Sequence, residues 1–267
     1  MSLSWRDRYV AVLCPERVAL VRRPAWAREW TLHGDAPCAA PGPQAAVEAL
    51  RGLLARDDVG RGELTLLLSG HFVQYLLVPW SAQVAGPAEL AAFAGVCFDE
   101  TFGGDHGTRE LRTARERAPG ARIAAALDQS LLQALRAAAA ASRLRLVSVQ
   151  PYLTAAFDRL RGALGRRDFV FVLAEPTRCC VLVATGGRWR SLRNASAHAR
   201  PRELANLVER EAQLAGLADE GMPGVFVHVA GHADMQLPPC HGVTPRSVGL
   251  RAAQAGDPLV AMAMTVA

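Results

Sequence analysis

The sequence predicts an α/β fold built from two similar halves. Short runs of β-branched and apolar residues alternate with longer segments whose apolar residues recur at helical spacing. The order strand, strand, strand, helix, strand occurs from Tyr9 to Ser69 and again from Phe169 to Val229. The halves share little residue identity, so the repeat lies in the architecture. A chain of 267 residues is long enough for one large domain or two smaller ones.

Local signals set the elements of the first half. Asp128 suits the N-cap of a helix, and Pro87 and Pro151 suit helix starts. The elements expected in chain order are strands over 9–14, 18–23 and 30–33, a loop over 35–43, a helix over 44–56, strands over 64–69 and 72–79, a helix over 87–102, a strand over 122–127, a helix over 129–141, a strand over 144–149 and a helix over 152–164.

The pattern restarts at Asp168. Gly186–Gly187 is a strong signal for a hairpin turn. The expected elements are strands over 169–173, 179–184 and 189–193, a helix over 201–217, a strand over 225–229, a short strand over 248–251 and an apolar tail over 258–267. We place the first half at 1–167, with an insertion at about 72–120, and the second half at 168–267.

Charge and composition restrict the chemistry. The formal net charge is +5, and all 30 basic residues are arginine. Schiff-base catalysis and a lysine phosphate clamp are therefore excluded. The arginines are spread along the chain and aromatic residues make up only 6%, whereas nucleic-acid binding favours a contiguous basic stripe interleaved with aromatics. We expect no nucleic-acid partner.

Membrane and export signals are not evident. The sequence contains no apolar run of about 18 residues, the length needed to cross a bilayer. Residues 1–8 are polar and charged, without the apolar core of a signal peptide. We therefore expect a cytoplasmic protein that associates with a membrane only through a partner.

Two segments resemble a known family. Three antiparallel strands followed by a helix and a parallel strand form the ribonuclease H-like unit, and two such units form the actin-like fold. Leu66–Trp80 (LLLSGHFVQYLLVPW) and Val147–Leu164, which begins VSVQPYLTAAFDRL, resemble the actin-like family of PilM and the cytoplasmic domain of GspL. The resemblance implies a role in type IV pilus or type II secretion assembly. The partner that the resemblance implies is a cytoplasmic segment of a bitopic inner-membrane protein. Binding would take place at the inner-membrane face.

The phosphate turns depart from the actin-like pattern. The resemblance implies an Asp-x-Gly hairpin in each half, with the carboxylate serving Mg²⁺ and the glycine letting backbone N–H groups approach phosphate. Pro15 stands in the first hairpin, and Ala174 and Pro176 replace the aspartate and glycine of the second. We therefore expect a non-catalytic scaffold with no catalytic residues and no cofactor.

An ATP-binding enzyme of the actin and sugar-kinase superfamily, with an atypical site, is the alternative. Its nucleotide-binding candidates are Glu175 in the second hairpin and Gly231 and His232 in the adenosine-side turn. A zinc site formed by His232, Cys240 and His241 would contain one thiolate at irregular spacing, so we expect no metal.

Overall fold

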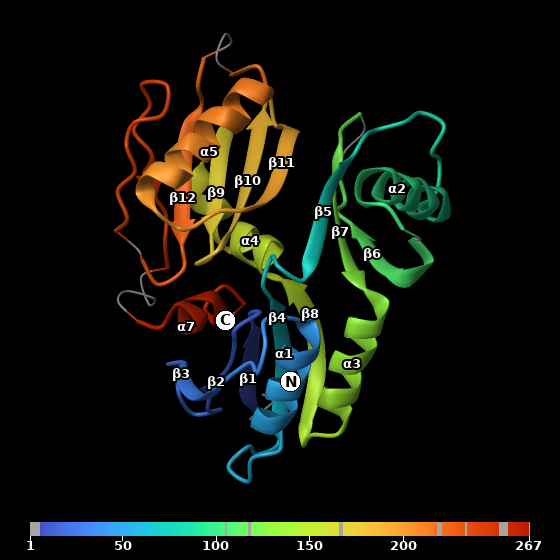
Figure 1. Ribbon diagram of the computed structural model, residues 1–267, viewed down its shortest axis with the longest axis vertical. Coiled ribbons are helices and arrows are strands. Elements are labelled where there is room, and N and C mark those ends of the chain that lie inside the picture. The colour runs from blue at the N-terminus through green and yellow to red at the C-terminus, as the bar shows by residue number, and fades with distance from the viewer. Residues whose placement is uncertain are drawn as a thin grey trace.

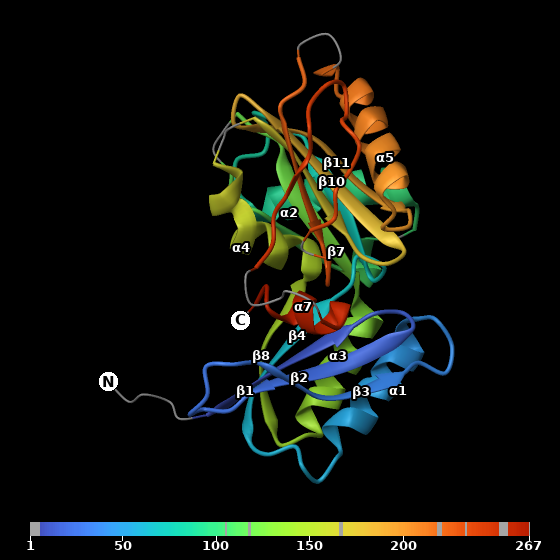
Figure 2. The same ribbon diagram turned by 90° about the vertical axis from the view of Figure 1, so that its left-hand side faces the viewer.

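The computed structural model describes residues 6–104, 106–116, 119–165, 168–217, 221–232, 234–250 and 256–266. Three β-sheets organise these residues, two of five strands and one of three (Figure 1). Figure 2 shows the first two sheets at opposite ends of the molecule, with the C-terminal helix between them. No helix among the described residues is both long and apolar enough to cross a bilayer.

The first sheet has the strand order β3-β2-β1-β4-β8. β1 pairs antiparallel with β2 and parallel with β4. Helix α1 makes the return crossover that parallel pairing requires. The predicted repeat unit is therefore confirmed in this half. The bounds are β1 (Asp7–Leu13), β2 (Arg17–Arg23), β3 (Thr31–Pro37), α1 (Pro43–Leu54), β4 (Gly62–Leu68) and β8 (Leu144–Pro151).

The expected loop over 35–43 was wrong at its start, because β3 continues to Pro37. The pairing of β2 with β3 shifts between Leu20 and Val21, which leaves His33 as an extra residue. Beyond this bulge, Arg17 at the start of β2 donates to the Asp35 carboxylate at 2.8 Å. Pairing with β2 thus overrides the turn-forming composition of this segment.

The second sheet repeats the first, with the order β11-β10-β9-β12-β13. Gly186 and Gly187 have φ values of +58° and +70°, which confirms the predicted hairpin turn. The short strand near 248–251 was misplaced: β13 is Arg246–Ser247, and Arg251 lies outside the described residues. The bounds are β9 (Phe169–Ala174), β10 (Arg178–Thr185), β11 (Arg188–Ser196), α5 (Pro201–Leu214), β12 (Gly224–Val229) and β13.

The insertion forms the third sheet, with the order β5-β7-β6. β7 pairs with both neighbours, so this unit extends to Asp128, past the expected limit of about 120. Helix α2 covers one face through Ala94 and Phe98, which are fully buried. The bounds are β5 (Val73–Val78), α2 (Pro87–Phe102), the 3-10 helix η1 (His106–Thr108), β6 (Arg109–Thr113) and β7 (Arg122–Asp128).

Helix α3 (Gln129–Ala140) returns the chain from the insertion to the first sheet. The Asp128 carboxylate accepts hydrogen bonds from the N–H groups of Ser130 and Leu131, at 2.8 and 3.1 Å, which confirms the predicted N-cap. α3 packs against α1 on one face of the sheet, whereas α4 (Tyr152–Leu164) contacts β8 and the second half's β9.

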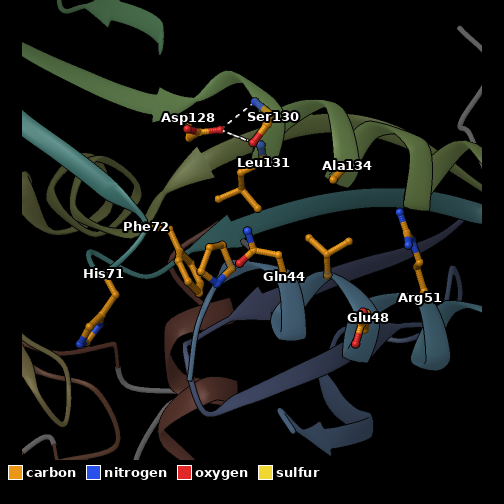
Figure 3. Close-up of a pocket in the computed structure, with 11 residues that line it drawn as sticks. Gln44, Glu48, Arg51, His71, Phe72, Asp128, Ser130, Leu131 and Ala134 are labelled. Atoms are coloured by element: carbon orange, nitrogen blue, oxygen red, sulfur yellow. Dashed lines mark hydrogen bonds between the residues drawn. The ribbon is translucent and has the colours of Figure 1, made fainter. Parts of the chain in front are cut away.

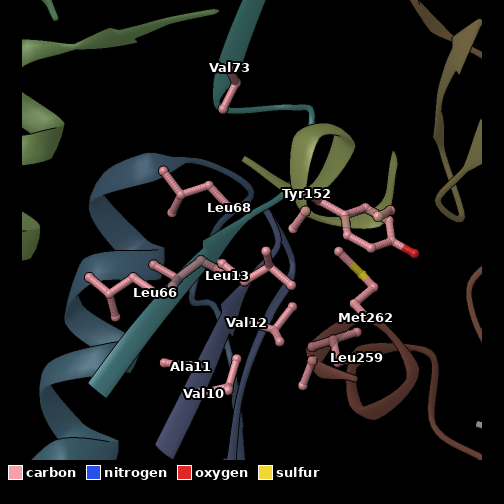
Figure 4. Close-up of a cluster of buried hydrophobic side chains, with 14 of the residues drawn as sticks. Val10, Ala11, Val12, Leu13, Leu66, Leu68, Val73, Tyr152, Leu259 and Met262 are labelled. Atoms are coloured by element: carbon pink, nitrogen blue, oxygen red, sulfur yellow. The ribbon is translucent and has the colours of Figure 1, made fainter. Parts of the chain in front are cut away.

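One hydrophobic core joins the two halves. It contains residues of the first sheet, α4, β9 and the C-terminal helix α7 (Pro258–Ala263). Figure 4 shows Leu259 and Met262 of α7 beside Val12 and Tyr152. Met262 is fully buried, and burying such a side chain stabilises the fold by about 1.5–3 kcal/mol. The predicted apolar tail therefore includes a helix packed on the first sheet.

Candidate functional site

The carboxyl ends of two pairs of parallel strands meet where the halves face each other. β1 and β4 end together in the first sheet, as β9 and β12 do in the second. Ligands of open α/β sheets bind beyond the carboxyl ends of strands. Four turns follow these strands, at residues 14–16, 69–72, 175–177 and 230–232. We call the space between them the interdomain cleft.

The turn between β1 and β2 uses its backbone groups within the first half. The Cys14 N–H donates to the Arg17 carbonyl at 3.0 Å, and Pro15 has no N–H. The Glu16 carbonyl accepts from the Cys38 N–H at 2.8 Å. A proline ring and a bonded amide thus stand where a phosphate-binding turn would present N–H groups.

The turn between β9 and β10 has the same arrangement. The Glu175 N–H donates to the Arg178 carbonyl at 2.8 Å, and Pro176 again removes a donor. The Pro176 carbonyl accepts from the Ala199 N–H at 3.3 Å, which ties the turn to the segment before α5.

The side chain of Glu175 crosses the cleft and binds the end of β4. The Gly70 N–H donates to Oε1 at 2.8 Å, and the Ser69 hydroxyl donates to Oε2. Glu175 is only 2% exposed. Burial raises the pKa of its carboxyl to about 7, although the hydrogen bonds from Ser69 and Gly70 act in the opposite direction. Both oxygens of this carboxylate are therefore engaged by the opposite half.

His71 extends the contact. Its Nδ1 lies 2.9 Å from the Ser69 hydroxyl and its Nε2 lies 3.2 Å from the Thr177 hydroxyl. Because the Ser69 hydroxyl donates to Glu175, we assign the His71 proton to Nδ1, so that Nε2 accepts from Thr177. Burial, followed by the charge of Arg178, lowers the pKa of His71 to about 4. A neutral imidazole therefore bridges the two halves near pH 7.

Asn194 of β11 completes this group of bonds. Its side-chain amide donates to the carbonyls of Gly70 and Val73, at 2.8 and 3.1 Å. The turn after β4 is thus held by the second half through both its N–H and its C=O groups. We call the following residues the interdomain latch: Ser69, Gly70, His71, Glu175, Thr177 and Asn194.

The chain's own C-terminal segment covers the turn that contains Gly231. Gly231 has a φ of +77°, and a Cβ added there would lie 3.1 Å from the Cα of Pro258 and 3.2 Å from the carbonyl oxygen of Gly256. His232 next to it is exposed. The structure thus places Glu175 and Gly231 at the same sheet edge, but Glu175 is bonded to the first half and Gly231 lies under the start of α7.

Two contacts fix α7 in this position. Asp257 caps the helix by accepting from the Leu259 N–H at 2.8 Å. Asp257 also forms an ion pair with Arg17, at the first hairpin. The start of α7 is thus bonded to the first hairpin and lies against the turn that contains Gly231.

A groove remains open elsewhere, between the first half and the insertion. Its volume is about 270 Å³. Apolar side chains line most of it, half of the lining residues coming from β7 and β8, and Glu110, Arg112 and Arg136 stand among them. β8 is the edge strand of its sheet. The lining residues are Leu68, Val73, Glu110, Arg112, Ala125, Ala126, Leu127, Leu132, Arg136, Leu146, Val149 and Pro151.

A β-bulge in β8 shapes the floor of this groove. The pairing of β8 with β4 passes from Leu146 to Ser148, so Val147 is an extra residue. The bulge shifts the alternation of the strand by one, which allows Leu146 and Val149 both to face the groove. Val147 itself is 51% exposed and does not line the groove.

A second pocket, of about 400 Å³, separates α1 from α3 (Figure 3). Gln44, Glu48 and Arg51 of α1 face Leu131 and Ala134 of α3 across it. His71 and Phe72 close one end. This pocket therefore reaches the interdomain latch from the side opposite the second half.

The histidine and cysteine residues near β12 do not converge. His228 is buried, with Nδ1 2.9 Å from the Val248 carbonyl oxygen and Nε2 3.1 Å from the Tyr152 hydroxyl. His232 and His241 are exposed, whereas Cys240 is fully buried. Within the described residues, no three side chains of the metal-binding types gather at one point.

Comparisons of sequence give no match, either to a protein-family model or to a curated protein. Comparisons of structure do. The cytoplasmic domain of EpsL, an inner-membrane component of the type II secretion system of Vibrio cholerae, is 11% identical, with a TM-score of 0.53 over 97% of this chain and 95% of its own. The PilM–PilN type IV pilus biogenesis complex is 16% identical, with a TM-score of 0.55 over 97% and 96%.

A third structure decides the fold. A Bacteroides thetaiotaomicron protein of actin-like ATPase fold and unknown function is 8% identical, with a TM-score of 0.53 over 85% of this chain and 83% of its own. The chain has the actin-like fold. The predicted fold class, two ribonuclease H-like units with an insertion in the first, is therefore confirmed.

Of the latch residues, the sequence indicates Glu175 as functional but gives no signal for Thr177 or Asn194. The sequence indicates Glu175 as a carboxylate that could serve a bound nucleotide, and in the structure its side chain binds the opposite half. Asn194 and Thr177 carry no motif, and their partners lie more than 100 residues away. The groove residues Leu146 and Val149 are also missed, because the bulge at Val147 breaks the alternation that identifies one face of a strand.

Proposed function

We propose that this protein is a non-catalytic actin-like scaffold that binds a cytoplasmic segment of a bitopic inner-membrane protein, in a machine of the pilus or secretion type. Two structural relatives support the class of machine, since one is a component of a type II secretion system and the other a pilus biogenesis complex. Each aligns over 97% of this chain. The protein then works at the inner-membrane face of the cytoplasm.

One observation carries the proposal: the interdomain cleft is filled by the chain itself, while the groove beside the insertion is open. Glu175 is bonded to Gly70 of the opposite half, and the residues at the start of α7 lie against Gly231. The groove between β7 and β8 presents apolar walls to a ligand. Binding in this fold is therefore favoured at the insertion rather than between the halves.

The groove suits an extended peptide. β8 is an edge strand, so its outer backbone groups can pair with an added strand. Alternate peptide side chains would then enter between Leu146 and Val149 on one side and Ala126 on the other. Arg112 is paired with Glu110, whereas the exposed Arg136 favours an acidic residue beside these apolar anchors.

Peptide binding tests this proposal. The ligands are labelled peptides from the cytoplasmic segments of inner-membrane proteins encoded next to this chain, measured by fluorescence anisotropy. Leu146→Arg places a charge in the apolar floor and should weaken binding by at least ~10-fold. Val147→Arg is the matched control, because the neighbouring side chain lies outside the groove. Arg136→Glu, at an exposed position, tests the rim independently of folding.

Two results would count against the proposal. One is equal weakening by Leu146→Arg and Val147→Arg in folded protein. The other is unchanged affinity in both Leu146→Arg and Arg136→Glu.

The alternative function, an ATP-binding enzyme with an atypical site, would use Glu175, Gly231 and His232. It requires α7 to leave its position over Gly231 and the Glu175 carboxylate to leave Ser69 and Gly70. Calorimetric titration with MgATP separates the two functions, since only the enzyme needs the interdomain cleft.

A further inference from the structure

Arginines that are scattered in the sequence gather at one edge of the first sheet. β1, β4 and β8 run parallel, so their amino ends lie side by side at the lower end of the molecule in Figure 1. The register places Arg8 opposite Arg23. Arg6, Arg61 and Arg143 each come directly before the first paired residue of β1, β4 and β8, since Asp7 pairs with Gly62 and Gly62 with Leu144. We call this surface, with the β2–β3 loop over 24–30, the basic edge. Its arginines are Arg6, Arg8, Arg23, Arg28, Arg61 and Arg143.

These six arginines carry charge that nearby carboxylates do not neutralise. Among the described residues, none of the six forms an ion pair, and all but the half-buried Arg23 are exposed. The acidic groups Asp7, Asp58 and Glu63 at this edge are already paired with three other arginines. Glu29 and Asp57 are the remaining acidic residues here. The edge therefore has a clear excess of positive charge.

A tryptophan projects from the same edge. Trp26, in the β2–β3 loop, is 74% exposed. The loop is held in place, because the Ala25 N–H donates to Asp7 Oδ1 at 3.0 Å and Arg22 donates to Oδ2 of the same carboxylate at 2.9 Å. The Arg23 guanidinium lies 5.1 Å from the ring centroid of Trp30 at the end of the loop. An indole is thus presented outward from an anchored, basic surface.

We propose that the basic edge rests directly on an anionic lipid bilayer, with the Trp26 indole at the level of the head groups and the arginines against lipid phosphates. Tryptophan is enriched at membrane interfaces, where its ring is amphipathic. Each arginine near an anionic membrane surface strengthens binding by about fivefold. A single projecting ring surrounded by arginines fits a broad, flat anionic surface better than a nucleic-acid strand, which favours a row of stacking aromatics.

This contact goes beyond the proposed scaffold function, in which a partner alone holds the protein at the membrane. It needs no peptide in the groove, which lies at the other end of β8, near Pro151. It can therefore be tested on the full chain with lipid alone, and its failure would leave the peptide proposal standing.

The test is co-sedimentation of the full chain with vesicles of phosphatidylcholine containing phosphatidylglycerol, and with vesicles of phosphatidylcholine alone. We expect binding to the anionic vesicles that falls steeply between ~0.1 and ~1 M salt, because the Debye length shrinks from about 10 to 3 Å. Arg28→Glu combined with Arg61→Glu should weaken binding by at least ~20-fold. Trp26→Ala should remove the part of binding that persists in high salt.

Matched controls make the result specific. Arg159→Glu combined with Arg202→Glu changes the net charge equally at exposed positions away from this edge. Trp80→Ala removes another exposed indole, 46% exposed, from the end of β5. Equal loss in the control and edge variants would overturn the proposal. Equal binding to neutral and anionic vesicles would also overturn it. So would binding to a DNA duplex without binding to either kind of vesicle.

Discussion

Replacing Glu175 with glutamine should change how the stability of the protein depends on pH. In the folded protein, burial raises the pKa of Glu175 from 4.5 to about 7. Because the folded pKa is above the unfolded one, the contribution of Glu175 to folding is full below about pH 4.5 and is lost as the pH rises to 7 and beyond. A tenfold change in a protonation equilibrium corresponds to about 1.36 kcal/mol, so the stability lost between pH 5 and pH 8 is about 2–3 kcal/mol.

Glutamine has no proton to lose and keeps a similar shape. Its Oε1 can still accept from the Gly70 N–H, and its Nε2 can donate to the Ser69 hydroxyl oxygen. The stability of Glu175→Gln minus that of the wild type should therefore rise by about 2–3 kcal/mol from pH 5 to pH 8. The lowered pKa of His71 makes stability rise with pH over the same range, so the test uses the difference between variant and wild type rather than the wild-type profile alone.

The assay is urea-induced unfolding followed by circular dichroism, at several pH values from 5 to 8. Glu63→Gln is the control, because Glu63 lies nearer the surface and is bonded to Arg145 rather than to the opposite half. It removes a carboxylate without removing a bond across the cleft. A constant difference for Glu175→Gln would refute the assignment of a buried, proton-binding carboxyl to the latch.

Substitutions at three further positions test the contacts described above, each by urea unfolding. Asn194→Ala leaves the carbonyls of Gly70 and Val73 without their donor and should cost about 1–3 kcal/mol, whereas a loss below the error of the assay would show that this bond is not formed. Met262→Ala should cost about 2–5 kcal/mol, and Met262→Leu less than about 1.5 kcal/mol, if α7 is packed on the first sheet. Asp128→Ala should cost about 1 kcal/mol through the lost N-cap of α3, and Asp128→Asn much less.

The architecture could be predicted from the sequence because it rests on local signals. The strand β9 is buried along its whole length, and such a strand appears in the sequence as the continuous apolar run Phe169–Leu173. Asp128 and Gly186–Gly187 mark a helix start and a hairpin through their own backbone preferences. Repetition of these signals in the same order was enough to indicate two actin-like halves.

The site could be predicted only in part, because its contacts join residues far apart in the chain. The proline residues in both hairpins drew attention to the turns, since a missing N–H is visible in the sequence. The partner of Glu175 is not visible there, because Ser69 and Gly70 lie 106 and 105 positions away. The apolar tail likewise gave no sign that it would return to the first hairpin and cover Gly231.

Titration of the full chain with MgATP in a calorimeter tests the central claim most directly. With Glu175 bonded across the cleft and α7 over Gly231, we predict no saturable heat of binding at millimolar nucleotide, in the wild type or in Pro176→Gly. Stoichiometric binding with a micromolar Kd would contradict this account, because the latch and α7 would then have to give way to a ligand for which they leave no room.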